Sequence, residues 1–463
     1  MSRLKLLALL VLTLAIVGST SQANAANPSF KVVLSGSSAL WNSLAIAAYN
    51  SGKCVNGAKA PCFHYTSGAN FNLSDTRPTL KGGSTAVDAG ATWIVWDSSA
   101  GPNVWVYIKE DSVVGQRCYF AQPRCNISVP TFPAAGNQIP STLWGDNSSD
   151  STPPAAVQAA LTSSSGVLVN GAATDIRPED GLFATCRANS QVDPKGKDVG
   201  LGYNANNAPG ACPTTNDLAH LAGSDIKSGY PASTAAFHVL AYNISGTDPF
   251  SGKSIPTSST VSIGASPIVF VTQRTGALAS VTNTSESRIQ TVFGGSNCDA
   301  SVFGAPEGVI DVYNREPLSG TFNTVEMSTF WYPRSGVSGG EVVHPGTSQE
   351  HNVKGTNPMA GLPCKAGGAR WRAIGTGEEV KSVQNSNTNN GHDGIGYTFF
   401  SYGNVSPIAN SADYGYLTLN GVDPILRNTY QDPRESGLGP SAGSCIMSPV
   451  MPRSLPRRSR RSI

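Results

Sequence analysis

Two short loops rich in serine and glycine carry side chains suited to binding an anion. The first loop is Ser35-Gly36-Ser37-Ser38, and the second runs from Arg315 to Thr321. Each loop lies between a strand pattern and a helical pattern, at 31–34 and 39–49 for the first loop and at 309–313 and 322–330 for the second. Free backbone N–H groups at the start of a helix attract anions. The two loops therefore predict two walls of one anion-binding cleft.

Side chains within these loops have chemistry complementary to an oxyanion. Arg315 can offer a bidentate fork, while Ser319 and Thr321 place hydroxyl groups beside the amide of Gly320. In the first loop, Ser38 is predicted to cap the helix that follows. Each feature alone is also typical of an ordinary helix cap or strand end. Their repetition within one chain favours a binding site.

The elements that position these loops belong to a weakly charged chain rich in glycine and proline. Of its 463 residues, 13% are charged, where about 25% is usual. The formal net charge of +2 argues against a nucleic-acid partner. Seven basic residues lie in the first 25 or the last 18 positions, which leaves a mildly acidic body. With 39% apolar residues the chain can bury a core, so wholesale disorder is excluded.

Residues 1–25 predict an export signal. Two basic residues precede an apolar run from Leu6 to Val17, and Ala23-Asn24-Ala25 supplies the small-residue pattern that signal peptidase accepts. The run is too short to span about 30 Å of hydrocarbon. We therefore expect cleavage after Ala25 and a periplasmic or secreted protein.

Cysteine usage is consistent with export. Four short-range disulfides can be drawn, Cys54–Cys62, Cys118–Cys125, Cys186–Cys212 and Cys298–Cys364, with Cys445 left over. In an oxidising compartment such pairs staple loops, although spacing alone does not fix connectivity. A metal site would need closer cysteine spacing with nearby histidines. Glu341, His344, Glu350 and His351 cluster, but they match no metal signature, and we expect a solvated loop there and no metal or cofactor.

The region between the two anion loops has a different pattern. Residues 91–120 are predicted to form strands, of which Cys118-Tyr119-Phe120 is the last. Segments at about 127–165 and 186–233 are rich in Ser, Pro and Gly and predict irregular loops.

Five stretches, in this order, resemble the phosphate-binding proteins of bacterial phosphate ABC transporters. The stretches are Ser35-Gly36-Ser37-Ser38-Ala39-Leu40, Thr174-Asp175-Ile176-Arg177-Pro178-Glu179-Asp180, Ile289 through Gly295, Arg315 through Thr321, and Gly394-Ile395-Gly396-Tyr397. The Arg-x-x-x-Ser-Gly-Thr loop is the most specific of them. The resemblance covers about half of the mature chain, discontinuously.

The resemblance implies an α/β, two-lobed type II periplasmic-binding-protein fold. The expected parts are a signal peptide (1–25), the N-terminal part of lobe 1 (26–265) with a β-rich insertion at about 69–173, lobe 2 (266–390), a return to lobe 1 (391–445) and an irregular basic tail (446–463). The tail departs from the family pattern. It is either natural or the product of a shifted reading frame.

The resemblance also implies a ligand and its contacts. It predicts inorganic phosphate, or a close oxyanion, delivered to an inner-membrane ABC permease by a monomeric protein. The ligand-binding residues carried over are Ser37, Ser38, Ala39, Ser67, Asp175, Arg315, Ser319, Gly320 and Thr321. In the family the aspartate accepts a hydrogen bond from protonated phosphate, which sulfate cannot supply. About a hundred residues before Asp175 and the Ile-Arg pair after it depart from the family pattern, so another oxyanion remains open.

Two other classes of function compete with capture of phosphate. A secreted adhesion protein would use the Trp-rich region at 91–120 to bind a glycan or a protein. A phosphate-ester hydrolase would use a serine of the Ser37-Ser38 loop, but the sequence shows no base for it. Two Gly-x-Ser-x-Gly matches, at Ser338 and Ser441, lack the following helix of a nucleophile elbow. We therefore expect a protein that is not an enzyme.

Overall fold

The structure is a computed structural model of the whole chain. It describes residues 27–51, 62–75, 86–98, 101–145, 148–182, 242–248, 251–263, 266–315, 319–325, 328–329, 351–352, 364–373, 375–400, 402 and 414–424. The expected signal peptide and basic tail lie outside these residues, as do both Gly-x-Ser-x-Gly serines. Glu341, His344 and Glu350 lie outside them too.

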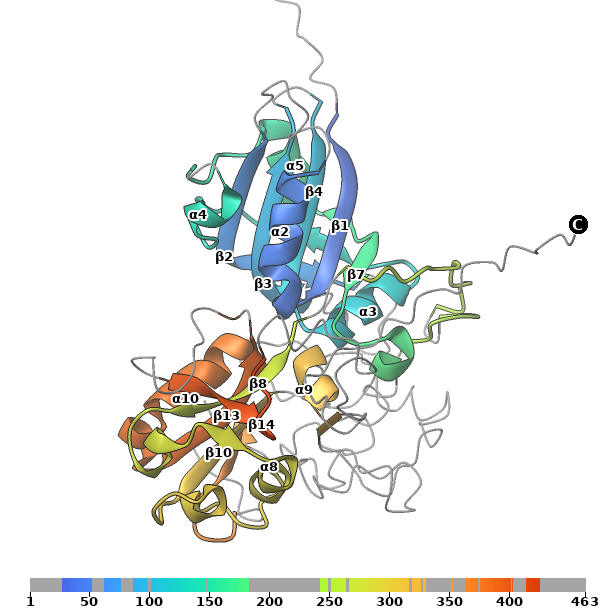
Figure 1. Cartoon of the computed structure of the whole chain (residues 1–463). Coiled ribbons are helices and arrows are strands. Elements are labelled where there is room, and N and C mark those ends of the chain that lie inside the picture. Colours follow the sequence, from blue (N-terminus) through green and yellow to red (C-terminus); the bar gives the residue numbers. More distant parts are fainter. Residues whose placement is uncertain are drawn as a thin grey trace, which may run out of the picture.

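Seven strands from the N-terminal half form one sheet (Figure 1). They are β1 (Ser29–Ser37), β2 (Phe63–Ser74), β3 (Ala86–Trp96), β4 (Asn103–Glu110), β5 (Asn126–Ser128), β6 (Val167–Leu168) and β7 (Gly171–Ala173). Their order is β6-β5-β2-β3-β4-β1-β7. β1 runs parallel to β4 and β7, while β3 is antiparallel to both β2 and β4. The carboxyl ends of β1, β4 and β7 therefore meet at one edge.

Alternating residues of these strands pack into separate cores on the two faces of the sheet. On one face, Trp93 and Tyr107 pack with Trp41 of α2 (Trp41–Tyr49) and with Trp144 of α4 (Ser141–Trp144). On the other face, Ile94 and its neighbours pack against α3 (Ser112–Phe120) and α5 (Ala155–Thr162). Both faces of the central strands are thus buried.

Seven strands from the C-terminal half form a second sheet. They are β8 (Ile268–Gln273), β9 (Asn283–Thr284), β10 (Ile310–Arg315), β11 (His351–Asn352), β12 (Arg370–Ala373), β13 (Asp393–Phe399) and β14 (Tyr414–Leu419). The order is β11-β12-β10-β13-β8-β14-β9. β10 runs parallel to β12 and β13, and β8 is antiparallel to both β13 and β14.

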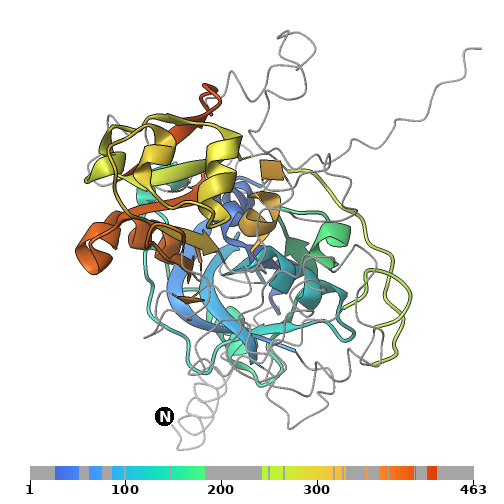
Figure 2. The same cartoon turned by 90° about the horizontal axis from the view of Figure 1, so that it is seen from below.

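Helices cover both faces of this second sheet as well. The apolar face of α8 (Glu286–Phe293) packs with Phe270 and Ile310. Val383 of α10 (Thr376–Asn390) packs with Val271 and Tyr313 on the opposite face. The short helix α9 (Gly320–Val325) follows β10, and Figures 1 and 2 both place it beside elements of the two sheets. Its position brings Gly320, at the end of the second anion loop, to the first sheet.

The first anion loop differs from the sequence prediction. β1 continues to Ser37, through residues expected to be loop, and a short 3-10 helix η1 (Ser38–Leu40) precedes α2. The capping side chain is Ser37, which accepts a hydrogen bond from the Ala39 N–H, and the prediction of Ser38 as the cap is wrong. β7 extends the ladder, because it pairs with residues 34–36 and holds them in a strand.

Two other predictions also need correction. Residues 118–120 end helix α3 and form no strand. Their aromatic and apolar side chains favour a strand locally, but burial around α3 overrides that propensity. The described strands of the expected return segment, β13 and β14, belong to the second sheet, because both pair with β8. The strands of the expected insertion join the first sheet beside β1.

The structure confirms two of the predicted disulfides, Cys118–Cys125 and Cys298–Cys364. Cys62 is also disulfide-bonded, but its expected partner Cys54 lies outside the described residues. The other predicted pair and Cys445 lie outside them too. Within the described ranges, no helix is both long enough and apolar enough to cross a membrane.

Candidate anion-binding site

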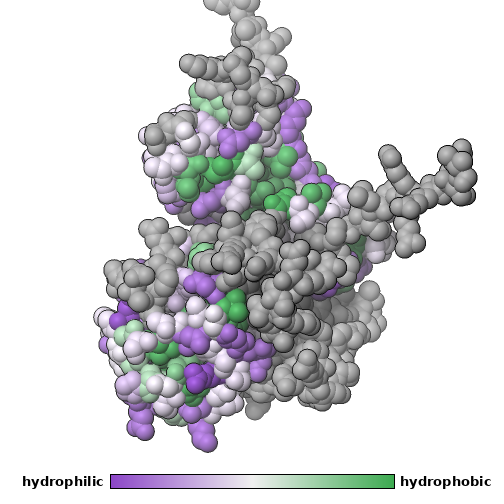
Figure 3. All heavy atoms as spheres, in the orientation of Figure 1, coloured by the Kyte–Doolittle hydropathy of each residue, from purple (hydrophilic) through white to green (hydrophobic). Residues whose placement is uncertain are grey.

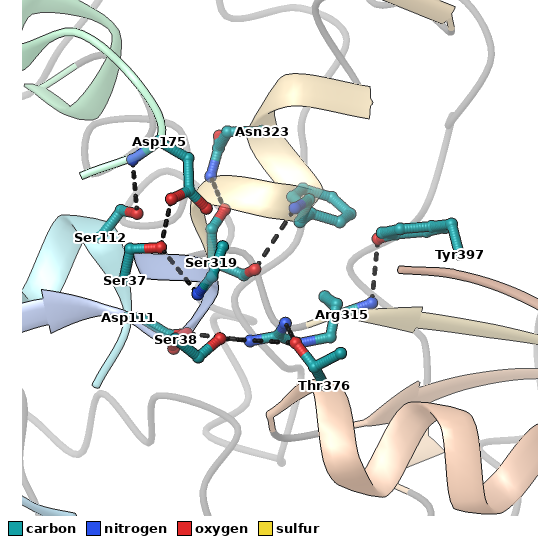
Figure 4. Close-up of polar contacts among 12 residues, drawn as sticks. Ser37, Ser38, Asp111, Ser112, Asp175, Arg315, Ser319, Asn323, Thr376 and Tyr397 are labelled. Atoms are coloured by element: carbon teal, nitrogen blue, oxygen red, sulfur yellow. Dashed lines mark hydrogen bonds and ion pairs between the residues drawn. The ribbon is translucent and has the colours of Figure 1, made fainter. Parts of the chain in front are cut away.

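The candidate site lies where strand ends and helix starts from both sheets converge. From the first sheet come the end of β1 at Ser37, the residues after β4, and Asp175 shortly after β7. From the second sheet come Arg315 at the end of β10 and the starts of α9 and α10. Figure 4 shows these side chains pointing toward one another. This is the location at which α/β sheets bind ligands, outside the carboxyl ends of parallel strands.

Asp175 occupies the centre of this group. Its carboxylate accepts hydrogen bonds from the hydroxyls of Ser37 and Thr321, and its backbone N–H donates to Ser112 Oγ at 3.1 Å. Burial raises the pKa of the Asp175 carboxyl. The hydrogen bond from Ser37, the positive charge of Arg315 and the hydrogen bond from Thr321 act to lower this pKa. Ionisation of the Asp175 carboxyl therefore costs free energy, and the hydrogen bonds from the two hydroxyls offset part of that cost.

Ser37 is fixed from two sides. Its hydroxyl donates to Asp175 and accepts from the Ala39 N–H at 3.1 Å, and its carbonyl accepts from the Tyr107 hydroxyl. Tyr107 is fully buried, and burial raises its pKa, so it stays a neutral donor. Ser37 therefore presents a defined hydroxyl at the start of η1.

Arg315 links the two sheets. The buried guanidinium forms an ion pair with Asp111, with 3.0 Å between Nη2 and Oδ1, and donates from Nη1 to Thr376 Oγ1 at 2.5 Å. Its backbone N–H donates to the Tyr397 hydroxyl at 3.0 Å. Thr376 Oγ1 also lies 3.4 Å from Ser38 Oγ. Asp111 thus neutralises Arg315 within the site.

Glycine is required at position 320. A Cβ atom there would lie 2.2 Å from Ser112 Oγ and 2.7 Å from Asp175 Oδ2. The close approach brings the first turn of α9 onto the first sheet. Ser319 Oγ accepts from the Phe322 N–H at 3.3 Å, and Asn323 Nδ2 donates to the Ser319 carbonyl at 2.8 Å. Both contacts fix the helix start.

Most of the residues predicted from the sequence lie together here. One group, connected around the Asp175 carboxylate, consists of Ser37, Ala39, Asp175, Gly320 and Thr321. Ser38 and Arg315 both contact Thr376 Oγ1. Ser319 caps the first turn of α9. Ser67 is not brought to this group. In the ladder, Ser67 of β2 is opposite Thr92 of β3, Thr92 is opposite Ile108 of β4, and Ile108 is opposite Ser35 of β1. Ser67 therefore lies three strands from the end of β1. At roughly 4.8 Å per strand, that is about 14 Å.

Three residues of the site were not predicted from the sequence. Asp111 and Ser112 follow β4 and begin α3, which is the same strand–loop–helix pattern as the two anion loops. Predicting a strand at 118–120 concealed that pattern. Thr376 lies in Gly375-Thr376-Gly377, which is too short for a nucleotide loop but provides a helix start.

Two observations bear on the adhesion function and on a hydrolase that would use Ser37 or Ser38. Of the three tryptophans in the Trp-rich region at 91–120, Trp93 and Trp96 are buried at 1% and 2% exposure, and Trp105 is partly buried. In the described part of the chain, the hydrogen-bond partners of Ser37 and Ser38 include no imidazole that could act as a base. The same part contains no group of three or more His, Cys, Asp or Glu side chains placed to hold a metal ion.

Solved structures of phosphate-binding proteins are similar to part of the chain. A phosphate ABC transporter substrate-binding protein with bound phosphate from Clostridium perfringens shares 18% identity at a TM-score of 0.25, over 36% of this chain and 51% of that chain. An ABC-type phosphate transport receptor from Vibrio cholerae shares 16% at a TM-score of 0.23, over 35% and 50%. PstS from Borrelia burgdorferi shares 14% at 0.23, over 38% and 62%. No protein-family model and no curated protein matches the sequence.

Proposed function

We propose that this protein captures inorganic phosphate or a closely related oxyanion at the Asp175–Arg315 site. The observation that carries the proposal is the convergence of Asp175, the hydroxyls of Ser37 and Thr321 and the start of α9 beside the buried Arg315. Helix starts supply N–H donors for an anion. When the proton of the ligand occupies the Asp175 carboxylate, the Ser37 and Thr321 hydroxyls that donate to it in the free protein turn to donate to the anion. Asp111 already neutralises the charge of Arg315, so binding of the anion relies on the N–H groups at the helix starts and on hydroxyl hydrogen bonds.

Asp175 supplies the basis for selectivity. An ionised carboxylate only accepts hydrogen bonds, so it matches an oxyanion that still carries a proton. Phosphate carries such a proton near neutral pH, whereas sulfate does not. Sulfate would leave the Asp175 acceptor unpaired and facing a negative charge, which is a penalty against the wrong ligand.

The proposed biological role is solute capture for import. The two sheets form the two lobes of an exported, monomeric binding protein, with the β-rich stretch at about 69–173 inserted into the first lobe. The ligand is held between the lobes, where Arg315 meets Asp111. The two lobes then close on the anion about the segments that connect them, and the closed, anion-bound protein delivers its ligand to an inner-membrane ABC permease.

Isothermal titration with phosphate and with sulfate tests this function. We expect heat with phosphate and at least tenfold weaker binding of sulfate. Arg315→Ala should abolish phosphate binding, because it removes the positive charge that offsets the Asp111 carboxylate within the site. Thr321→Val should weaken binding about tenfold or more, the cost of a hydrogen bond to a charged group.

A matched variant on the same helix controls for folding. Thr324 is buried on α9 like Thr321, but its hydroxyl donates to the Gly320 carbonyl at 2.8 Å. Thr324→Val should leave phosphate affinity within about threefold, because it removes one neutral hydrogen bond away from Asp175. A folded wild-type protein that gives no heat with phosphate would refute the proposal. Equal affinity for sulfate would refute the role of Asp175.

A further inference from the structure

A second polar cluster lies on the first sheet, away from the anion site. His64 Nε2 lies 2.6 Å from Ser148 Oγ, and His64 Nδ1 lies 2.9 Å from Asp150 Oδ1. The three groups are connected in the order hydroxyl, imidazole, carboxylate. This is the arrangement in which a histidine activates a serine nucleophile.

Asp150 is held as the orienting carboxylate. It accepts from Thr66 Oγ1 at 2.5 Å, from the Thr66 N–H at 2.9 Å and from the Asn137 N–H at 2.8 Å. Hydrogen bonds from His64, Thr66 and Asn137 outweigh burial and lower the pKa of this carboxyl. Because an ionised carboxylate only accepts, the proton of neutral His64 lies on Nδ1. Nε2 is then free to accept the proton of Ser148.

Aromatic rings fix the plane of His64. Trp144 stacks on it with 4.0 Å between ring centroids and an 8° interplanar angle, and Tyr49 meets it edge-on at 5.5 Å. The His64 side chain is 2% exposed, whereas Ser148 is half-buried. A substrate can therefore approach the hydroxyl while the base stays shielded from bulk water.

The loop that carries Ser148 has several attachments to β2. The loop is already attached to β2 by the Ser151 N–H, which donates to the His64 carbonyl at 2.7 Å, and by Asp150, which accepts from Thr66. The Trp144 Nε1–H beside the imidazole is buried and has no acceptor among the described residues. The alignment of the half-buried Ser148 hydroxyl with His64 and Asp150 favours a reactive hydroxyl over a purely structural one.

The surroundings indicate an apolar ester. Leu143, next to Trp144, is 45% exposed, and Figure 3 shows apolar residues gathered over α2, whose last residue is Tyr49. The cluster is also remote from the anion site. His64 pairs with Val95, Val95 with Trp105, and Trp105 with Val32, five residues before Ser37. Strand spacing and rise place the two sites on the order of 20 Å apart.

We propose that Ser148 is a nucleophile that hydrolyses carboxylic esters with apolar groups. Ser148 Oγ bonds to the carbonyl carbon as its proton passes to His64 Nε2. The carbon–oxygen bond to the alcohol then breaks, and the alcohol leaves with that proton. Water attacks the acyl-serine in the same way, its proton passing through His64 to Ser148 Oγ. The products are one carboxylic acid and one alcohol for each water consumed.

A fluorophosphonate probe and p-nitrophenyl acetate test the proposal on the full chain. We expect the probe adduct on Ser148, located by peptide mass spectrometry. Hydrolysis should fall at least a hundredfold in Ser148→Ala and in His64→Gln.

The control is Ser163→Ala, since the Ser163 hydroxyl bonds only the Ala160 carbonyl and Ser165 in the described structure. It should leave the rate and the labelling unchanged, and melting curves should show that all variants fold. Absence of label on Ser148 in folded protein would overturn the proposal, as would hydrolysis that persists in Ser148→Ala. Phosphate titration of Ser148→Ala should match the wild type, so the two proposals fail or succeed separately.

Discussion

At the scale of single residues, the buried Asp175 carboxyl carries an electrostatic cost of ionisation together with the binding role proposed for it. Burial opposes its ionisation, and hydroxyls of Ser37 and Thr321 partly offset that cost. Residues that bind a ligand often reduce the stability of the free protein, because they are placed for the bound state. Asp175 is thus a position where stability and binding are expected to change in opposite directions.

Asp175→Asn should stabilise the free protein at neutral pH and weaken phosphate binding. A raised folded-state pKa means that the folded chain holds this proton more tightly than the unfolded chain, so stability is lost as pH rises through the folded pKa. The variant should melt at a higher temperature than the wild type at pH 7, and at the same temperature below about pH 4. Its preference for phosphate over sulfate should fall at least tenfold, since the acceptor is gone. Calorimetry across pH and titration with both anions measure these effects.

Asp180→Asn is the matched control on the same turn. Asp180 pairs with the half-exposed Arg177 at 2.9 Å, and such surface pairs contribute about 0–1 kcal/mol. Its melting temperature and anion preference should stay close to those of the wild type. A lower melting temperature for Asp175→Asn than for the wild type at pH 7 would contradict the prediction.

At the scale of elements, the pairing of β1 with β7 positions the first half of the site. Gly36 lies at φ +133°, opposite Ala173 in the ladder, and a Cβ there would lie 2.0 Å from the Ala173 carbonyl oxygen. Two residues after Ala173 the chain reaches Asp175. The close approach of two backbones therefore sets the distance between Ser37 and Asp175.

Gly36→Ala should unfold or loosen this edge of the sheet. The methyl group can be accommodated only if β7 moves away, so we expect a loss of more than about 3 kcal/mol of unfolding free energy and loss of phosphate binding. Gly304→Ala is the control, since Gly304 has φ +80° with nothing within 4 Å of an added Cβ. It should cost only the left-handed strain of about 1–2 kcal/mol. Equal costs in urea unfolding would show that the Ala173 contact is unimportant.

Local patterns predicted the anion loops because their chemistry is contained within a few residues. Ser37 and Arg315 were each predicted between an apolar strand and a helix, and in the structure each is the last residue of a strand that a helix follows. Ser67 was misplaced because β3 and β4 lie between β2 and β1, and strand order depends on contacts distant in sequence. The helix at 118–120 and the pairing of β13 with β8 were missed for the same physical reason, since burial decides both.

At the scale of the whole molecule, the ion pair of Asp111 and Arg315 joins the two sheets. Asp111 is 6% exposed and Arg315 is 1% exposed at their side chains, so the pair is shielded from solvent. Removing one partner of a buried pair leaves a charge uncompensated and costs about 3–5 kcal/mol. That cost can be relieved by separating the sheets and hydrating Arg315.

Asp111→Asn should increase the radius of gyration of the phosphate-free protein in small-angle scattering. Asp75→Asn is the matched control, because Asp75 forms a similarly buried pair with Arg117 at 2.6 Å, entirely within the first sheet and its helices. Both variants should melt at lower temperatures, but only Asp111→Asn should expand. Identical scattering of the two variants would mean that the Asp111–Arg315 pair does not control the separation of the sheets.

The exposed segment at 256–263 lies between a first sheet built from residues 29–173 and a second built from residues 268–419. Severing the chain in that segment would break no described strand pairing, and each fragment would keep its own core. The anion site would be divided, with Ser37 and Asp175 on one fragment and Arg315 and Thr321 on the other. Two such fragments would therefore rebuild the candidate site only on reassembly, which is the layout needed for a split reporter.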